Sequence, residues 1–248
     1  LLTGWKVLEA EYTGIKPPDW VKPLVYIAIP WAFSIHTVTA FIYSGLPGRD
    51  YWLTALTAPK FLASAFATGP ALLILISFAL RRFAGFDAGK EAIRRLSLIV
   101  AYAMSITVFM VLVEFFTAFY SQVPSHMYAL KYFFVGLYGG NGFIAISWVF
   151  AILCLLSLLL LLNPTTRKND KWLTVACIST FIALAIEKGI QFTVGGFIPN
   201  AFGKETEYWP TALELGIVLG IWALGAFLLS LLYSLFVMVK RRSEGRVG

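Results

Sequence analysis

Six long apolar segments constrain this chain more than any other feature. They lie at residues 23–45, 60–80, 96–120, 142–162, 172–194 and 211–239. Each approaches or exceeds the roughly 20 residues that an α-helix needs to cross a bilayer, and none shows the alternating pattern of a spanning β-strand. Only 13% of the 248 residues are charged, whereas soluble domains carry about 25%. The sequence therefore predicts an all-α integral membrane protein, a bundle of six transmembrane helices.

The basic residues between these segments predict the orientation of the chain. Of the 20 Lys and Arg residues, fifteen fall on one side of the predicted membrane, in segments 6–22, 81–95, 167–171 and 240–246. Cytoplasmic loops carry the excess of Lys and Arg. We therefore expect a multi-pass protein of the cytoplasmic membrane with both ends of this sequence in the cytoplasm. The net charge of +7 then reflects topology and a solvated, lipid-facing rim, and no nucleic-acid partner is expected.

The rest of the chain divides simply around the six spans. We predict a cytoplasmic amphipathic lead-in at 1–22, one six-helix transmembrane domain at 23–239 and a basic cytoplasmic tail at 240–248. Loops expected on the outer side, at 45–52, 121–141 and 195–210, are rich in glycine and aromatic residues, and such loops commonly carry binding surfaces. The first residues lack the apolar core of a cleavable signal peptide. The sequence begins at Leu rather than Met, so we expect it to be part of a longer protein.

Ionisable residues inside a membrane are costly and are candidates for function. By the rise of an α-helix, those in these spans all lie in the outer half of the membrane, although they come from four different segments: His36, Glu114, Glu187, Lys188 and Glu214. The pattern favours a polar pocket that opens to the outer leaflet. The alternative is a structural ion-pair network in which Glu114 or Glu187 neutralises Lys188.

Several ligand classes do not fit the sequence. Only His36 lies in a span and His126 lies in an outer loop, so a haem with two histidine ligands is not expected, and the CxxCH motif of covalent haem is absent. Cys154 and Cys177 are far from any CxxC pattern and are interpreted as packing residues. What fits is an organic ligand that enters from lipid and exchanges protons with carboxylates and imidazole, such as a quinone. A transported ion or small solute is the alternative.

Four stretches of the sequence resemble a known family. They read AIPWAFSIHTVTAFIYSGLPGRDYW, LTALTAPKFLASAFATGPALLIL, VLVEFFTAFYS and GGFIPNAFGKETEYWP. Together they resemble the NrfD/polysulfide-reductase family of membrane subunits over nearly the whole chain, in particular the branch that contains the P subunit of the sulfite-reduction-associated DsrMKJOP complex. Members of this family usually have eight to ten helices. The resemblance therefore implies that further helices, on the N-terminal side, belong to the protein.

The resemblance also implies a function. It implies a membrane subunit of a respiratory oxidoreductase that has no haem or iron–sulfur cluster of its own. Such a subunit exchanges electrons between menaquinone or menaquinol, bound exchangeably, and a ferredoxin-like iron–sulfur subunit on the outer face. Other membrane and cytochrome subunits complete the complex. His36 of SIHT and Glu114 of VEFF fall in the family's quinone-pocket region, but Ile42 stands where several relatives have Asp.

We predict that quinone binding and proton exchange involve six residues: His36, Lys60, Glu114, Glu187, Lys188 and Glu214. Two rival interpretations stay open at this point. The chain could be a proton- or ion-translocating subunit that resembles a transporter, or a purely structural membrane anchor whose polar cluster serves stability alone. A translocating subunit needs a polar path through the inner half of the membrane, and the sequence offers few hydroxyl groups there: Ser97, Tyr102, Ser105 and Thr107.

Overall fold

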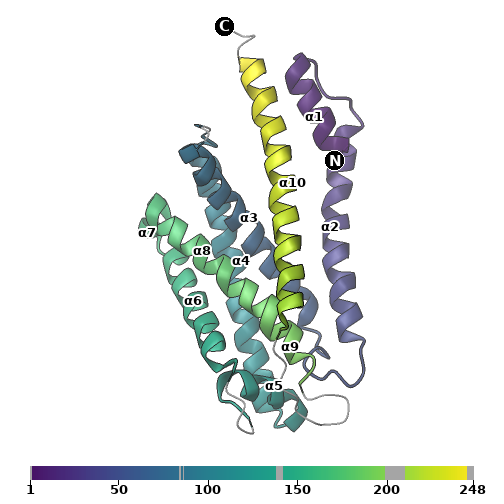
Figure 1. Ribbon diagram of the computed structural model, residues 1–248, viewed down its shortest axis with the longest axis vertical. Helices are drawn as coiled ribbons and strands as arrows, with labels where there is room; N and C mark the ends of the chain where they lie inside the picture. The colour runs from purple at the N-terminus through teal and green to yellow at the C-terminus, as the bar shows by residue number, and fades with distance from the viewer. Residues whose placement is uncertain (1, 84, 86, 138–141, 199–209, 245–248) are drawn as a thin grey trace. The chain divides into compact units, whose positions relative to one another are not determined.

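The computed structural model (Figure 1) describes residues 2–83, 85, 87–137, 142–198 and 210–244, with side chains up to residue 239. The described chain is helical: α1 (Leu2–Thr13), α2 (Val21–Ser44), α3 (Thr57–Phe83), α4 (Lys90–Tyr120), α5 (Pro124–Phe134), α6 (Ile144–Leu162), α7 (Pro164–Lys168), α8 (Asp170–Ile186), a π-helical segment (Glu187–Phe192), α9 (Thr193–Gly195) and α10 (Ala212–Glu244). Within these residues, six helical stretches are long and apolar enough to cross a membrane, and they match the six predicted segments. The predicted fold class is confirmed.

The chain divides into two compact units, Leu1–Ser34 with Tyr208–Gly248, and Ile35–Glu207. The first unit contains α1, the N-terminal part of α2 and α10. In this unit α1 packs against α10. Most side chains of α10 are exposed, among them Leu213, Leu219 and Ile221. A helix that is apolar on every face suits contact with lipid or with further membrane helices.

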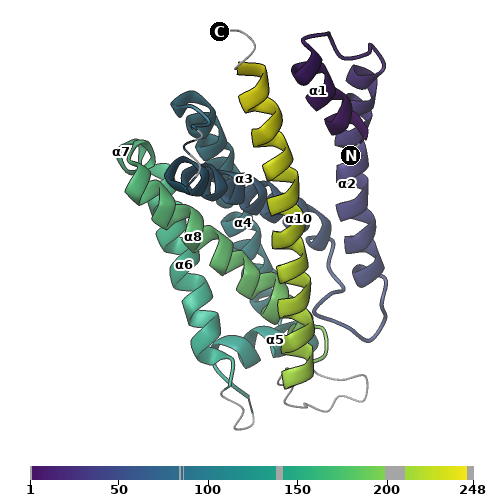
Figure 2. The same ribbon diagram turned by 45° about the horizontal axis from the view of Figure 1, so that its top comes forward.

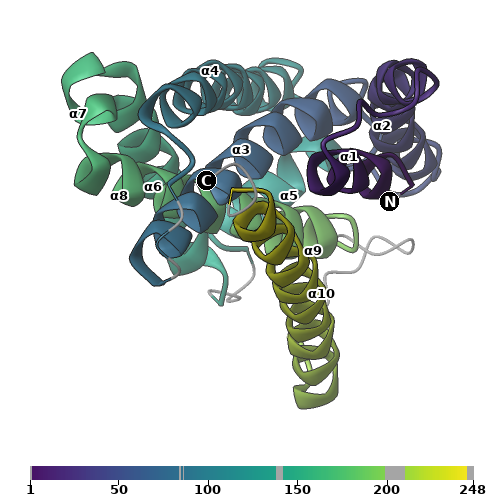
Figure 3. The same ribbon diagram turned by 90° about the horizontal axis from the view of Figure 1, so that it is seen from above.

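The second unit is an antiparallel bundle of four helices, α3, α4, α6 and α8. Helix α3 packs against α4 and α8, and α6 packs against α8 and α4; the pairs can be followed end-on in Figure 3. The buried core of the bundle includes small residues of α3 and α4, among them Ala67, Ala71, Ala101 and Ala103. Small side chains let two backbones approach closely, and such packing drives helix association in membranes.

The core of this bundle also holds both cysteines. Cys154 of α6 and Cys177 of α8 are buried and carry free thiols. They belong to the apolar core of the bundle, which also includes Ile74, Phe150 and Leu184. The structure thus places both thiols where packing residues are expected.

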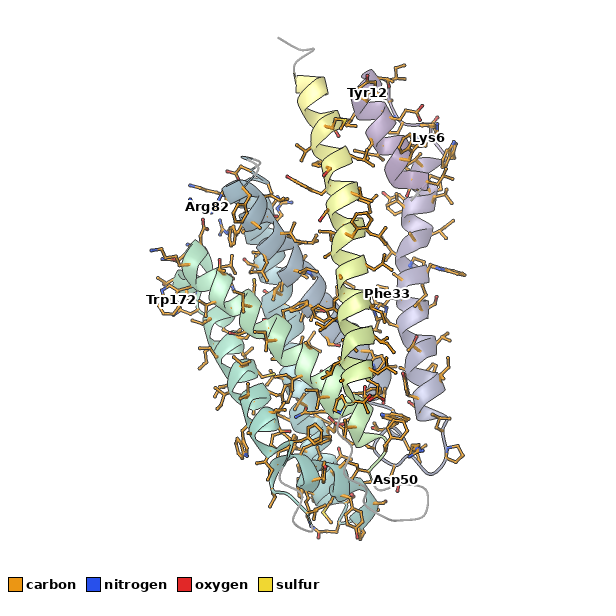
Figure 4. All side chains as sticks on the ribbon, viewed as in Figure 1. Lys6, Tyr12, Phe33, Asp50, Arg82 and Trp172 are labelled. Carbon is orange, nitrogen blue, oxygen red and sulfur yellow. The ribbon has the colours of Figure 1, made fainter. Side chains whose placement is uncertain are left out.

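The two ends of the second unit differ in structure. Helix α7 and the segment before α4 lie at one end, and α5 and residues 45–56 lie at the other. Figure 4 labels Arg82 and Trp172 at the first end and Asp50 at the second. The first is the basic end predicted to face the cytoplasm, and the second is the predicted outer end.

The interpretation of residues 121–141 as a loop is wrong for much of its length. Helix α5 fills Pro124–Phe134 and packs against α4 and α6, and Figure 2 shows it lying across the end of the unit. Pro124 stands in the first turn, where a proline needs no hydrogen bond to its nitrogen. One face of α5 buries Ala129, Leu130 and Phe133. Residues 138–141 and 199–209, within the predicted outer loops, and residues 245–248 of the tail lie outside the described residues.

Two glycines let the outer loop at 45–56 approach the end of the fifth span. Trp52 is buried, and its indole Nε1 donates a hydrogen bond to the carbonyl of Phe192 at 2.7 Å. A Cβ atom added to Gly196 would overlap the Trp52 ring, and one added to Gly195 would lie 2.7 Å from the Tyr51 ring. Any larger residue at either position would push this loop away from the bundle.

We expect Gly196→Ala to lower the free energy of unfolding by about 1–3 kcal/mol, the usual cost of overpacking a close contact. Thermal unfolding of the purified protein in detergent measures this. Gly69→Ala is the matched control, because an added Cβ there meets open space and alanine favours a helix over glycine. Equal melting temperatures for the two variants would contradict the close approach of Trp52.

Candidate functional site

Four of the six predicted site residues meet in one ion cluster. The Nζ atom of Lys60 lies 2.5 Å from Oε2 of Glu114 and 3.0 Å from Oε1 of Glu187. The Nζ atom of Lys188 lies 3.3 Å from the same Oε1 of Glu187. Exposure falls from 27% for the Lys188 side chain to 14% for Glu114, 7% for Lys60 and 2% for Glu187. Two cations balance two carboxylates, which is the condition for keeping charges buried.

Three spans supply this cluster at the outer end of the bundle. Lys60 comes from the first turn of α3, Glu114 from the last two turns of α4, and Glu187 directly follows α8. Helix α3 packs against both α4 and α8. The cluster therefore forms only when α3 holds the ends of α4 and α8 at the same height.

A π-helical segment, Glu187–Phe192, directly follows α8. Its wider turn buries both Glu187 and Gln191. The Oε2 atom of Glu187 and the Nε2 atom of Gln191 are buried, and no described residue forms a hydrogen bond with either atom. Single π turns inside α-helices are rare and often occur at functional sites. The segment thus brings two polar side chains to the inside of the bundle at the level of Lys60.

A cavity of about 270 Å³ lies beside the cluster. Its polar lining comes from three parts of the chain: Asp50, Tyr51, Thr54, Glu114, Thr117 and His126. A second void, of about 10 Å³, lies between Tyr51, Lys60, Glu114, Glu187 and Gln191. Glu114 and Tyr51 line both spaces. The Glu114 carboxylate therefore connects an open cavity with the buried ion cluster.

The phenol of Tyr51 keeps its proton in this position. Burial raises the pKa of Tyr51 well above its ordinary value, and the nearby Glu114 carboxylate raises it further. The charge of Lys60 acts in the opposite direction but does not reverse the shift of the Tyr51 pKa. Tyr51 is thus a hydrogen-bond donor at the cavity wall, next to a carboxylate acceptor.

Aromatic rings enclose Lys188 on the other side of the cluster. Its Nζ atom lies 4.3 Å from the ring centroid of Phe61 and 5.8 Å from that of Phe192. Tyr43, near the C-terminal end of α2, packs edge-on against both rings. A cation over aromatic faces is stabilised by the ring quadrupoles. Among the described residues, Lys188 is therefore held by one carboxylate, that of Glu187, together with these aromatic rings.

The other two predicted site residues lie elsewhere. His36 is partly buried on α2, two turns before Tyr43, and is not among the described residues that line the cavity. Glu214 belongs to the first unit, where its Oε2 atom accepts hydrogen bonds from the backbone and hydroxyl of Thr211 at 2.7 and 2.8 Å. This contact caps the start of α10. A role of either residue in quinone binding stays a prediction.

Sequence reasoning missed the neighbours that the loops supply. Asp50 and Tyr51 stand in a segment predicted as an outer aromatic loop, and the sequence argument considers His126 only to exclude it as a haem ligand. The missed signal in residues 124–134 is a short helical pattern of apolar residues after a proline. That pattern places His126 in the first turn of α5, beside α4.

Together these features define a multi-pass helical membrane protein with a neutral ion cluster and a polar cavity near one membrane face. Residues 5–195 match the family described as "Polysulphide reductase, NrfD". The chain therefore belongs to the NrfD polysulfide-reductase family of membrane subunits, which confirms the family predicted from the sequence motifs.

Two relatives are similar to the chain over most of its length. The chain is similar to the "Hdr-like menaquinol oxidoreductase integral membrane subunit" of Archaeoglobus fulgidus, with 25% identity over 238 residues that cover 89% of this chain and 58% of the relative. It is also similar to a selenate reductase subunit of Mesobacillus selenatarsenatis, with 24% identity over 259 aligned residues that cover 98% of this chain and 59% of that protein. The chain thus spans little more than half the length of these relatives.

We expect Lys60→Met to lower the free energy of unfolding by about 3–5 kcal/mol, because it leaves Glu114 without its cation inside the bundle. Lys6→Met is the control. It breaks a Lys–Glu pair of 2.6 Å whose side chains are 34% and 47% exposed, and exposed pairs contribute about 0–1 kcal/mol. Chemical unfolding in detergent compares the two variants. Similar losses would show that the cluster contributes no more than a surface pair.

Proposed function

We propose that this chain is the quinone-interacting membrane subunit of a respiratory redox complex. In this proposal it exchanges electrons between menaquinone or menaquinol and an iron–sulfur partner at the outer end of the bundle. Membership of the NrfD family and similarity to a menaquinol oxidoreductase subunit support the proposal. The observation that carries it is the position of Glu114, whose carboxylate lines an open cavity and also pairs with buried Lys60.

The cavity has the donors and acceptors that a quinone head group requires. Its volume of about 270 Å³ is near the lower end of the range for small-molecule sites. Tyr51 and His126 would donate hydrogen bonds to the quinone oxygens, and Glu114 or Asp50 would hold the exchanged protons. A quinone supplies two-electron chemistry that is coupled to the uptake or release of two protons. The cavity also has apolar walls that suit a ligand entering from lipid: Leu53, Leu56 and Leu130.

Lys60 links the two carboxylates of the cluster. Its ammonium lies between Glu114 and Glu187 and forms an ion pair with each. If Glu114 took a proton from the cavity side, Lys60 would keep its contact with Glu187 at 3.0 Å. Glu114 is the carboxylate proposed to exchange protons, because it lines the cavity and Lys60 has this second carboxylate partner.

The ion cluster, in which two cations balance two carboxylates, also supports the alternative that the chain is a purely structural membrane anchor.

The alternative of a proton- or ion-translocating subunit is less well supported. Thr107 and Thr180 are buried below the cluster, but each hydroxyl donates to a carbonyl of its own helix, at 2.8 and 2.9 Å. Ser157 contacts Thr180 at 2.5 Å, and the Tyr102 side chain points outward with 70% exposure. The described residues therefore offer no continuous polar path to the basic end.

Three further points belong to this proposal. The outer end, with α5 and the loop at 45–56, would bind the ferredoxin-like iron–sulfur subunit, and other membrane and cytochrome subunits would complete the complex. The basic end would face the cytoplasm, as would both ends of this sequence. Within the family, the sequence motifs favour the branch of the DsrMKJOP complex. This chain would carry no haem or iron–sulfur cluster, since only one of its two histidines lies in a predicted span and its two cysteines are too few to ligate a cluster.

We expect Glu114→Gln to lower quinone-linked electron transfer about 10²- to 10⁴-fold, the usual contribution of a general acid or base, while the complex still assembles. Glutamine keeps the shape and hydrogen bonding of the side chain but removes the base. Glu91→Gln is the matched control, because Glu91 stands at the other end of the same helix with its side chain 67% exposed. Turnover and subunit stoichiometry are measured on the same preparations. Normal turnover of Glu114→Gln would refute a role in proton exchange.

His36→Ala tests whether a residue outside the described cavity lining serves the same reaction. If His36 and Glu114 act on one quinone, the double variant should be little slower than the slower single variant, because residues that act as a unit are not additive. Independent effects that multiply would assign His36 to a separate step. Lost assembly with normal specific activity in the surviving complex would favour the structural anchor.

A further inference from the structure

A large cavity lies at the basic end of the second unit, opposite the ion cluster. Its volume is about 820 Å³. Six cationic side chains line it, from α3, α4, α7 and the start of α8: Arg81, Lys90, Arg94, Arg167, Lys168 and Lys171. Asp170 is the one acidic residue among the described lining residues. The basic segments that the sequence distributes over two loops thus converge on one cavity.

Most of this positive charge is not compensated within the described part of the chain. Asp170 pairs with Arg81 at 2.5 Å, and Arg167 donates to the neutral carbonyl of Leu161 at 2.9 Å. Lys90, Arg94 and Lys168 have no carboxylate within ion-pair distance among the described residues. The basic end differs in this respect from the outer end, where the cations of the ion cluster are paired with carboxylates. An uncompensated cationic cavity favours an anionic ligand.

The geometry of α4 separates cavity residues from ordinary surface residues. Lys90, Arg94 and Ser97 lie on one face at helical spacing and line the cavity. Arg95, the next residue along the chain, points to another face and pairs with Glu91 at 2.9 Å, with both side chains more than 60% exposed. Gly89 provides no side-chain cap for the first turn of α4, so the positive end of the helix dipole adds to the field at the cavity.

The cavity also has an apolar part. Ile93, Leu98, Pro164 and Leu173 contribute to its lining. A volume of about 820 Å³ falls within the range of sites for drug-sized ligands and is much more than a single phosphate ion fills. The cavity lies at the ends of membrane-spanning helices, where lipid head groups meet the protein. Cationic side chains above apolar walls match a charged head group with the first carbons of its acyl chains.

We propose that this cavity binds the phosphate-bearing head group of an anionic phospholipid. Lys90, Arg94 and Lys168 contact the phosphate, and the apolar residues contact the glycerol and the start of the acyl chains. Basic pockets between transmembrane helices on the cytoplasmic side are a recognised form of lipid recognition. The site is separate from the proposed quinone cavity, and the two share no lining residue among those described.

The test compares two double variants of the assembled complex in nanodiscs that contain equal amounts of phosphatidylglycerol and phosphatidylcholine. Arg94→Gln with Lys168→Gln removes two cavity charges. Arg82→Gln with Arg95→Gln removes two charges from the same end of the bundle, and neither residue is among the lining residues of the cavity. Lipids that stay bound through delipidating washes are quantified by mass spectrometry. Size-exclusion chromatography checks that each complex is intact.

We expect the wild-type complex to retain phosphatidylglycerol in preference to phosphatidylcholine. The cavity variant should lose about 20- to 30-fold in apparent affinity for phosphatidylglycerol, the contribution of two basic residues in contact with the head group. The control variant should lose less than about threefold, because Arg82 and Arg95 do not line the cavity. Equal losses in the two variants would show that general surface charge, and not a specific site, retains the lipid, and would overturn the proposal. Displacement of the retained lipid by millimolar inorganic phosphate, or retention of phosphatidylcholine alone, would also overturn it.

Discussion

The contact of Lys60 with Glu114 and Glu187 is the interaction on which the second unit depends. An ionised group inside a membrane is tolerated only when its partners stand in place. Because the three residues come from α3, α4 and the end of α8, the cluster fixes how far these helices slide along one another. Small core residues, such as the buried alanines of α3 and α4, do not by themselves fix the position of one helix along another. The ion cluster therefore selects one axial register of α3, α4 and α8 among those that the packing of small residues allows.

The outer loop is fixed to the same point by a different set of contacts. Trp52 donates to the carbonyl of Phe192 at 2.7 Å, and Arg49 donates to the carbonyl of Gly196 at 3.3 Å while its guanidinium lies 4.7 Å from the Phe197 ring centroid. Phe192 is the last residue of the π-helical segment, and Gly196 directly follows α9. The loop thus binds to the irregular backbone that positions Glu187. Tyr51 takes its place in the cavity wall as a consequence.

The six spans could be predicted because bilayer thickness sets the length of a helix, and length is visible in the sequence. Glu114, Glu187 and Lys188 could be predicted as a site because ionisable residues in a span are rare. Lys60 was also predicted as a site residue that could hold a carboxylate or a quinone oxygen. Its pairing with two carboxylates at once could not be predicted, since Lys60 stands at the boundary of its span, where a lysine is equally consistent with an interfacial charge. Helix α5 was missed because 11 residues are too short for a span and their apolar face is defined only by packing on α4 and α6.

Charged side chains are arranged differently at the two ends of the bundle, where the two proposed binding sites lie. At the outer end the charges are buried and neutralised in pairs, so they interact over short distances in a medium that salt screens little. At the basic end several cations are solvent-accessible and unpaired among the described residues, so their interactions with anions weaken as ionic strength rises. A change of salt should therefore alter lipid retention at the basic end before it alters proton exchange at Glu114. The two proposed sites are independent in electrostatic terms, although α4 contributes residues to both.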